Sequence, residues 1–131
     1  MTEPIWLPIE VVIETNRKIV TETGEPFFLR DRALLESAME RPKDHYYYAS
    51  EDDILNLSTI LMFGIARNHP FEQGNKRSGF LSAVLFLERN GYAFSFYDSG
   101  SVGKAITFVL EGRMTERKFI ESMRPYIVPL D

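Results

Sequence analysis

A chain of 131 residues, 44% of them hydrophobic and 13% aromatic, is long enough to fold around one core and too short for two ordinary domains. The formal net charge of -4, without a long run of Lys and Arg, argues against a broad nucleic-acid-binding surface. The absence of cysteine excludes disulfides and thiol chemistry, and two histidines are too few for an ordinary structural zinc site. The N-terminus shows no signal peptide, and no apolar run approaches the ~20 residues that cross a bilayer. We therefore expect one domain over residues 1–131, in the cytoplasm, with neither a membrane nor a nucleic acid as partner.

The first predicted helix covers about residues 9–23. Pro8 suits the first turn of a helix, and Gly24 is a typical residue just beyond a helix end. One stripe at helical spacing contains Ile9, Val12, Ile13, Asn16, Ile19 and Val20.

A second helix is expected from a cap at Asp31 to Arg41, where Pro42 ends it. Residues 43–49 then read as a non-helical segment that contains Tyr46, Tyr47 and Tyr48. Alternate side chains of an extended segment point to opposite faces, so at least one of these tyrosines should be exposed.

The remaining chain predicts four more helices and almost no strand. Residues 50–53 resemble a capping box, and the apolar periodicity of residues 54–68 indicates the most buried, central helix. Further helices are expected at about 80–90, 99–110 and 115–124, with a short extended segment at 92–97. Six helices in all indicate an all-α domain.

Residues 69–79, between the third and fourth of these helices, concentrate the chemistry. The first N–H groups of a helix have no partner within it, and its dipole places about half a positive charge there, so a helix start binds anions. Lys76 and Arg77 add two cations at this start, and the guanidinium can grip two phosphate oxygens at once. His69 precedes them and can accept a proton near neutral pH. Alone, each residue could be an ordinary helix end, turn or surface cation, but together they predict a phosphate site beside a base.

The sequence His-x-Phe-x-x-Gly-Asn-Lys-Arg at residues 69–77 is similar to the signature of the Fic/Doc (Fido) superfamily and most resembles its death-on-curing, or Doc, branch. Two further blocks, residues 29–42 and 85–92, resemble that branch in the same order. The resemblance implies a single Fido-type helical domain of about six helices, with a short flap before the central helix. It places that flap, which aligns a target peptide, at residues 43–49 with Tyr46, Tyr47 and Tyr48. An aromatic loop that packs on the core is the alternative for this segment.

The resemblance also implies an activity. His69 would take a proton from a Ser, Thr or Tyr hydroxyl of a target protein, such as a translation factor, and that hydroxyl would attack a phosphate of bound ATP or another nucleoside triphosphate. The backbone from Gly74 to Arg77 would cradle phosphate, with Lys76 nearby and with Asn75 and Arg77 in direct contact with phosphate oxygens. A toxin of this branch would also have a cognate antitoxin.

Three residues depart from relatives that transfer AMP. Lys76 stands where those enzymes carry glycine, and Phe80 where they carry a second arginine; the Doc branch shares the lysine, which favours kinase-like transfer. Gln73 stands at the position of the acidic Mg²⁺ ligand, and its neutral carbonyl should hold Mg²⁺ weakly. Three functions stay open: a Doc-type phosphotransferase toxin, a nucleotidyl (AMP) transferase, and a catalytically weak or inactive Fido-fold binding module.

Overall fold

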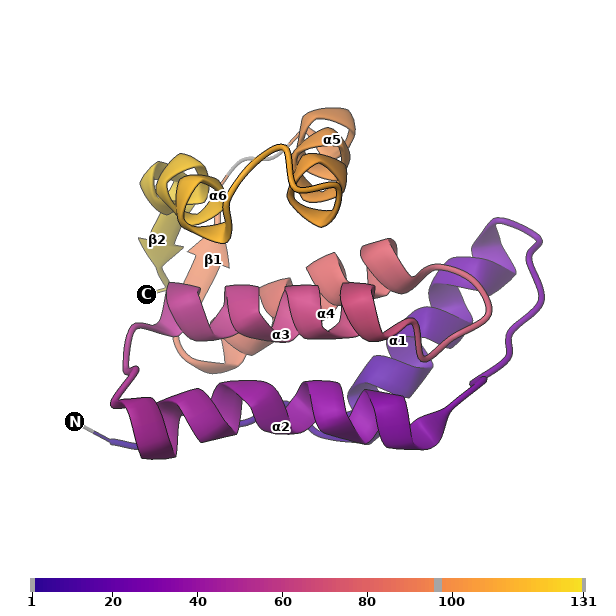
Figure 1. Ribbon diagram of the computed structural model, residues 1–131, viewed down its shortest axis with the longest axis horizontal. Coiled ribbons are helices and arrows are strands. Elements are labelled where there is room, and N and C mark those ends of the chain that lie inside the picture. Colours follow the sequence, from indigo (N-terminus) through magenta and orange to yellow (C-terminus); the bar gives the residue numbers. More distant parts are fainter. Residues whose placement is uncertain (1, 96–97, 131) are drawn as a thin grey trace.

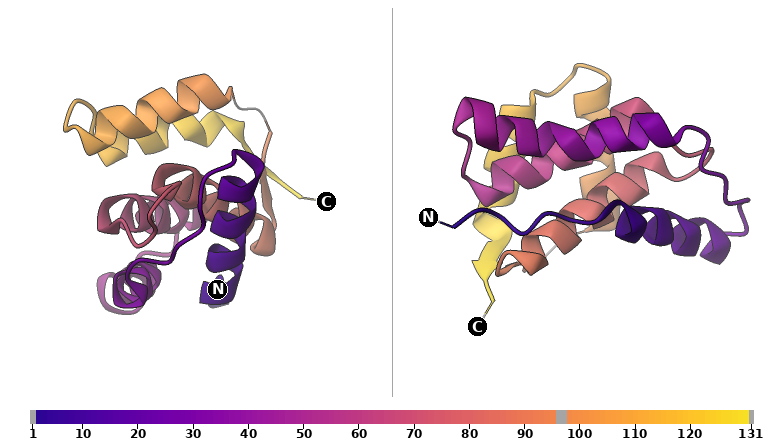
Figure 2. Two further views of the ribbon diagram at one scale, coloured as in Figure 1. Left: turned by 90° about the vertical axis from the view of Figure 1, so that its right-hand side faces the viewer. Right: turned by 90° about the horizontal axis from the view of Figure 1, so that it is seen from below.

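The computed structural model describes residues 2–95 and 98–130 and contains six α-helices over these ranges, which confirms the all-α class. The elements, in chain order, are α1 (Ile9–Glu22), α2 (Arg32–Ala49), α3 (Ile54–Asn68), α4 (Asn75–Arg89), β1 (Tyr92–Phe94), α5 (Ser99–Leu110), α6 (Glu116–Met123), a 3₁₀ turn (Arg124–Tyr126) and β2 (Ile127–Pro129). The helices form layers: α2 packs on one side of α3, and α5 and α6 cover α3 and α4 on the other side (Figures 1 and 2). Helix α1 lies against α4.

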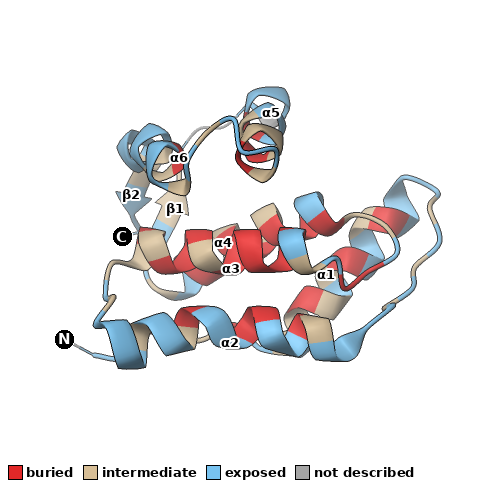
Figure 3. Ribbon diagram, in the orientation of Figure 1, coloured by how far each residue is buried: buried red, intermediate tan, exposed pale blue. Residues whose placement is uncertain are grey.

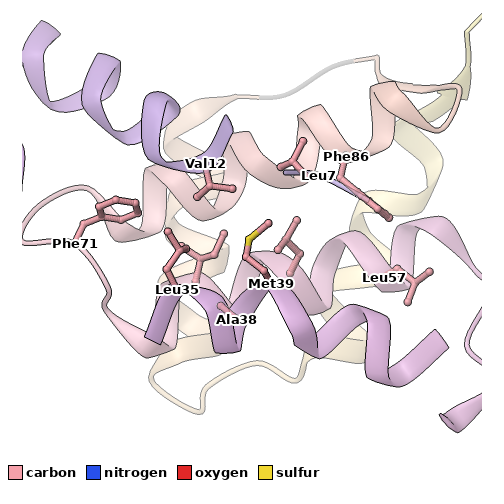
Figure 4. Packing of buried hydrophobic residues seen from close by; sticks show 10 residues of the cluster. Leu7, Val12, Leu35, Ala38, Met39, Leu57, Phe71 and Phe86 are labelled. Atoms are coloured by element: carbon pink, nitrogen blue, oxygen red, sulfur yellow. The ribbon is translucent and has the colours of Figure 1, made fainter. Parts of the chain in front are cut away.

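Helix α3 is the centre of the molecule, as its apolar periodicity predicts, and ten of its fifteen residues are buried (Figure 3). Its contacts with α4 are close because Gly79 lies at the crossing: a Cβ there would come within 2.7 Å of the Met62 carbonyl oxygen. The main hydrophobic cluster fills the space between α1, α2, α3 and α4 (Figure 4), and it comprises Leu7, Val12, Leu35, Ala38, Met39, Leu57, Leu61, Ile65, Phe71 and Phe86. A second cluster joins α3 and α4 to α5 and α6.

The two short strands pair antiparallel, with Tyr92 opposite Pro129 and Phe94 opposite Ile127. This pairing places the end of the chain beside the end of α4, where Leu130 N–H donates to the Gly91 carbonyl. The extended segment expected at 92–97 is confirmed for Tyr92–Phe94, and residues 96–97 lie outside the described ranges.

The second helix is longer than its sequence indicates, and the prediction that Pro42 ends it is wrong. Pro42 lies inside α2, which continues to Ala49, so residues 43–49 are helical. Proline removes the hydrogen bond to the carbonyl four residues earlier, that of Ala38. That local loss is outweighed by tertiary packing: Pro42 itself is buried, and the last turns of α2 hold Tyr46 edge-on against Trp6, with ring centroids 5.8 Å apart.

The cap of the central helix also differs from the expected capping box. Asp53, and not Ser50, is the N-cap, and its carboxylate accepts from the Asn56 N–H at 3.0 Å. Ser50 instead ends α2 in the left-handed conformation, with φ 55°. Because α2 extends to Ala49, Ser50 forms the C-terminal cap of α2 and is not the N-terminal cap of α3 that the sequence pattern predicted.

In the part of the chain that the structure describes, none of the helices has both the length and the apolar character to cross a membrane.

Candidate functional site

The segment from His69 to Gly74 joins α3 to α4 at one end of the helical layers (Figure 1). Phe71 anchors it: its side chain is 1% exposed and belongs to the main hydrophobic cluster. An extended stretch at residues 25–31 lies alongside, since Leu29 and Phe71 form an antiparallel bridge and Glu72 N–H donates to the Phe28 carbonyl at 2.9 Å. No local sequence pattern predicts this pairing, because it joins residues about forty positions apart.

The start of α4 offers unpaired backbone donors. Gly74 is the N-cap with φ 76°, and glycine has no side chain with which to cap the helix, so no cap occupies the first N–H groups of Asn75, Lys76 and Arg77. Glycine is required here for space as well as for conformation, because a Cβ would lie 3.2 Å from both Asn16 Nδ2 and Val20 Cγ1. The helix starts at Asn75, earlier than the expected residue 80, so both cations lie in its first turn.

His69 is held by its backbone while its side chain is exposed. It ends α3 in the left-handed conformation, with φ 52°, which is uncommon for a residue other than glycine. Its N–H donates to the Ile65 carbonyl, and its carbonyl accepts from the Arg30 guanidinium. Its Nδ1 lies 3.2 Å from Asn75 Nδ2.

The side chain of Asn75 is turned into the loop of the motif. Its side chain was expected to contact phosphate, but the residue is only 5% exposed. Its Oδ1 accepts from the Phe71 N–H at 3.0 Å, and its Nδ2 donates to the Phe71 carbonyl at 2.9 Å. In this arrangement the amide closes the loop upon itself through the two backbone groups of Phe71.

Lys76 and Arg77 are exposed, and each contacts another element. Lys76 Nζ donates to Thr107 Oγ1 on α5 at 3.3 Å. Arg77 donates to Thr23 and pairs with the Glu25 carboxylate at 2.7 Å. Hydrogen bonds from Thr23 and Arg77 hold the pKa of Glu25 below its ordinary value. An anionic ligand of Arg77 would therefore compete with a carboxylate of the same chain.

Asn16 is a site residue that sequence reasoning did not single out. It is fully buried on α1, and its Nδ2 donates to the Gln73 carbonyl at 2.8 Å and to Ser78 Oγ at 2.9 Å. These bonds tie α1 to the loop on one side of Gly74 and to α4 on the other. The available signal was an asparagine within an otherwise apolar stripe, since a buried amide needs hydrogen-bonding partners.

A cleft of about 520 Å³ opens between α1, α4 and α5 beside the two cations. Lys76 and Arg77 line it together with apolar side chains, which include Ile19, Phe80, Val102 and Ile106. His69 does not line this cleft.

The metal position offers few donors. Gln73 is half-buried, and the carboxylate nearest to it in sequence is the exposed Glu72. Within residues 2–95 and 98–130, no group of three or more His, Asp or Glu side chains is placed to hold a metal ion. Mg²⁺ in proteins is ordinarily held through one or two carboxylates together with phosphates and water, and the Gln73 side chain carries no negative charge for it.

The three tyrosines, which the resemblance places in a flap over residues 43–49, lie on the last turns of α2 and away from this loop. Helix α2 begins beside the loop, where Asp31 N–H donates to the Pro70 carbonyl, and Tyr47 lies about 22 Å further along at 1.5 Å per residue. Tyr47 donates to Glu3 at 2.8 Å, a bond that raises the pKa of its phenol, and Tyr48 is 86% exposed. The expectation of an exposed tyrosine is confirmed, but the segment beside the loop is 25–31.

Comparison with known proteins identifies the family of the chain. The family model described as Fic/DOC family matches residues 6–87, so the chain belongs to the Fic/DOC family. It is 26% identical over 117 residues to the protein kinase doc of Escherichia phage P1, an alignment that covers 89% of this chain and 90% of that protein. It is 35% identical over 69 residues to the toxin Doc of Mycolicibacterium smegmatis (strain ATCC 700084 / mc(2)155), which covers 52% of this chain and 53% of that one.

Proposed function

We propose that this protein is a Doc-type toxin that transfers a phosphoryl group from ATP, or another nucleoside triphosphate, to a Ser, Thr or Tyr hydroxyl of a target protein. The observation that carries the proposal is the uncapped N-terminus of α4, with Lys76 and Arg77 in its first turn and His69 seven residues before Lys76, at the start of the loop. The names of the two relatives, a protein kinase and a toxin, support the same class.

In the proposed reaction, the first N–H groups of α4 and the two cations bind the phosphates. His69 accepts the proton of the target hydroxyl, whose oxygen forms a bond to the terminal phosphorus as the nucleoside diphosphate leaves. Most of the acceleration would come from positioning and from charge stabilisation at the helix start, as is general for phosphoryl transfer. Mg²⁺ would arrive with the nucleotide and neutralise phosphate charge. From the protein it would be offered the neutral side-chain carbonyl of Gln73.

Transfer of a terminal phosphate is favoured over transfer of AMP by the residues at the start of α4. Lys76 is directed to Thr107 on the rim of the cleft, where it can reach a phosphate beyond those held by the helix backbone. Phe80 lines the apolar cleft at the position where the AMP-transferring relatives carry arginine, and it supplies no charge to distal phosphates.

A target peptide would be aligned by the extended residues 25–31 and not by the tyrosines of α2. This stretch already pairs with the loop through Leu29 and Phe71, and Phe28 is 56% exposed beside it. The proposed partners are a translation factor as target and a cognate antitoxin that would restrain the toxin in the cell.

The deciding experiment uses two labelled nucleotides. Purified protein is incubated with a cell lysate and with ATP labelled either at the terminal phosphate or at the α-phosphate. A phosphotransferase labels a protein only from the first, and an AMP transferase only from the second. If neither label is transferred at any Mg²⁺ concentration while the protein still binds a lysate protein, the binding-module function replaces the proposal.

The two histidines provide a matched pair of variants. His69→Ala should lower transfer by about 10²–10⁴-fold, the usual cost of losing a general base, without loss of the fold. His45→Ala removes the other histidine, which is exposed on α2, and should leave transfer unchanged. Full activity of a folded His69→Ala protein would remove His69 from the mechanism.

A further inference from the structure

We infer that Asn75 is a positioning residue that holds the uncharged His69 ring with its proton on Nε2, so that His69 can accept a proton only after the hydrogen bond from Asn75 is broken. The second half of this inference rests on the proposed role of His69 as a base. The first half concerns the resting protein and needs no substrate.

The orientation of the Asn75 amide follows from its partners. The backbone N–H and C=O of Phe71 both face the Asn75 amide. Oδ1 lies 3.0 Å from the Phe71 nitrogen, and Nδ2 lies 2.9 Å from the Phe71 carbonyl oxygen. Turning the amide over would set N–H against N–H and oxygen against oxygen. At 5% exposure, water could not compensate for such a mismatch. Nδ2 is therefore the atom that faces His69.

The hydrogens on Asn75 Nδ2 determine which nitrogen of the neutral His69 ring carries the proton. Nδ2 carries two hydrogens and no acceptor, and one hydrogen is used by the Phe71 carbonyl. The other points to His69 Nδ1 at 3.2 Å, so Nδ1 must accept. In a neutral imidazole one nitrogen accepts and the other carries the hydrogen, which places the proton on Nε2.

This state is unsuited to proton abstraction. Nε2–H is a donor, and the lone pair that a base would use is on Nδ1, where Asn75 covers it. The backbone of His69 is fixed from both sides, by the Ile65 carbonyl and by the Arg30 guanidinium. Because the side chain is exposed, rotation of the ring away from Asn75 is the movement that remains for making it a base.

The chain offers a matched control for Asn75. Asn90 binds the peptide groups of Ile5 in the same two-way manner, with Oδ1 accepting from the N–H at 2.8 Å and Nδ2 donating to the C=O at 3.0 Å. Its second Nδ2 hydrogen goes to the Phe86 carbonyl. Asn90 thus makes three equivalent hydrogen bonds but has no contact with a histidine.

The experiment is ¹⁵N NMR of the histidine rings in the full chain without nucleotide, at a pH where both rings are neutral. Protonated and unprotonated ring nitrogens resonate far apart, so the proton position is read directly. In the wild type, His69 should be wholly the Nε2–H form, whereas the exposed His45 should show the mixture usual in water. Asn75→Asp replaces the donor by a carboxylate that can only accept, so His69 should change to the Nδ1–H form; Asn90→Asp should leave it unchanged.

Three results would overturn the inference. The first is a mixture of the two neutral ring forms of His69 in the wild type, like that of His45. The second is an unchanged proton position on His69 in a folded Asn75→Asp protein. The third is an equal change of the His69 proton position in Asn90→Asp. If Asn75→Asp does not fold, the comparison of His69 with His45 in the wild type still decides. Since no measurement involves transfer, failure of the proposed enzyme activity would be seen separately, in the labelling experiment.

Discussion

Replacement of Asn16 by alanine tests whether a buried amide on α1 holds the anion site in place. Asn16 makes two hydrogen bonds, to the Gln73 carbonyl at 2.8 Å and to Ser78 Oγ at 2.9 Å, and each such bond contributes about 1 kcal/mol net. Its Oδ1 is buried without a partner among the described residues, so removing that atom returns part of the cost. The cavity left in a fully buried position works in the opposite direction. We expect a loss of about 2 kcal/mol in the free energy of unfolding, measured with urea.

Ser82→Ala is the matched control for this variant. The Ser82 hydroxyl is also fully buried and has no partner in the described part of the chain, so its removal should cost less than about 0.5 kcal/mol or stabilise the fold. Asn16→Ala should also weaken nucleotide binding in calorimetry, because the loop before Gly74 loses its bond to α1. Equal costs of unfolding for the two variants, or unchanged nucleotide affinity in Asn16→Ala, would refute the reasoning.

Three further variants test the charges around the start of α4. Arg77→Ala should weaken ATP binding in calorimetry far more than Arg117→Ala, an exposed arginine on α6, and equal effects would remove Arg77 from the site. Because the pKa of Glu25 is lowered, its carboxylate stays charged and paired with Arg77 at every pH above the ordinary pKa of glutamate. The pair is lost only as the pH falls through the lowered pKa. At neutral pH, Glu25→Gln should therefore tighten ATP binding, and weaker binding would contradict a competition between Glu25 and phosphate for Arg77. Gln73→Glu should raise transfer or reduce the Mg²⁺ needed for half-maximal transfer, and no gain over an already active wild type would show that Gln73 does not limit the metal.

Local patterns predicted most of the helices because each depends on residues close in sequence. The bounds of α1, α3 and α5 agree with their predicted ranges to within a residue or two, and α6, which Thr115 caps, lies within the predicted range 115–124. The prediction that Pro42 ends the second helix was wrong because packing against distant residues outweighs the local effect of proline. The turns beyond Pro42 are held by Trp6, more than thirty residues earlier in the chain, and no window around the proline contains that information.

In the site, too, local features could be predicted from the sequence, whereas contacts between distant residues could not. The motif located the start of α4, with its two cations in the first turn, because a helix start, two cations and a glycine are all local features. It could not say that Asn75 faces inward, since that depends on the path of the loop back to Phe71. It could not show Glu25 against Arg77 either, because residues 52 positions apart meet only in the folded chain.

The backbone and the cations of the site are prepared for a ligand to different degrees. The backbone is preformed: Phe71 is buried, Asn75 closes the loop, and Asn16 fixes both of its flanks, so the N–H groups at the start of α4 need no rearrangement to meet an anion. The cations are engaged elsewhere, Lys76 with α5 and Arg77 with Glu25. Both contacts are exposed to solvent and therefore weak beside a charge-assisted bond to phosphate in the mouth of a cleft. Binding of a phosphate should accordingly keep the loop fixed and move the side chains, releasing residues 25–31 from Arg77 on the side where a target peptide would approach.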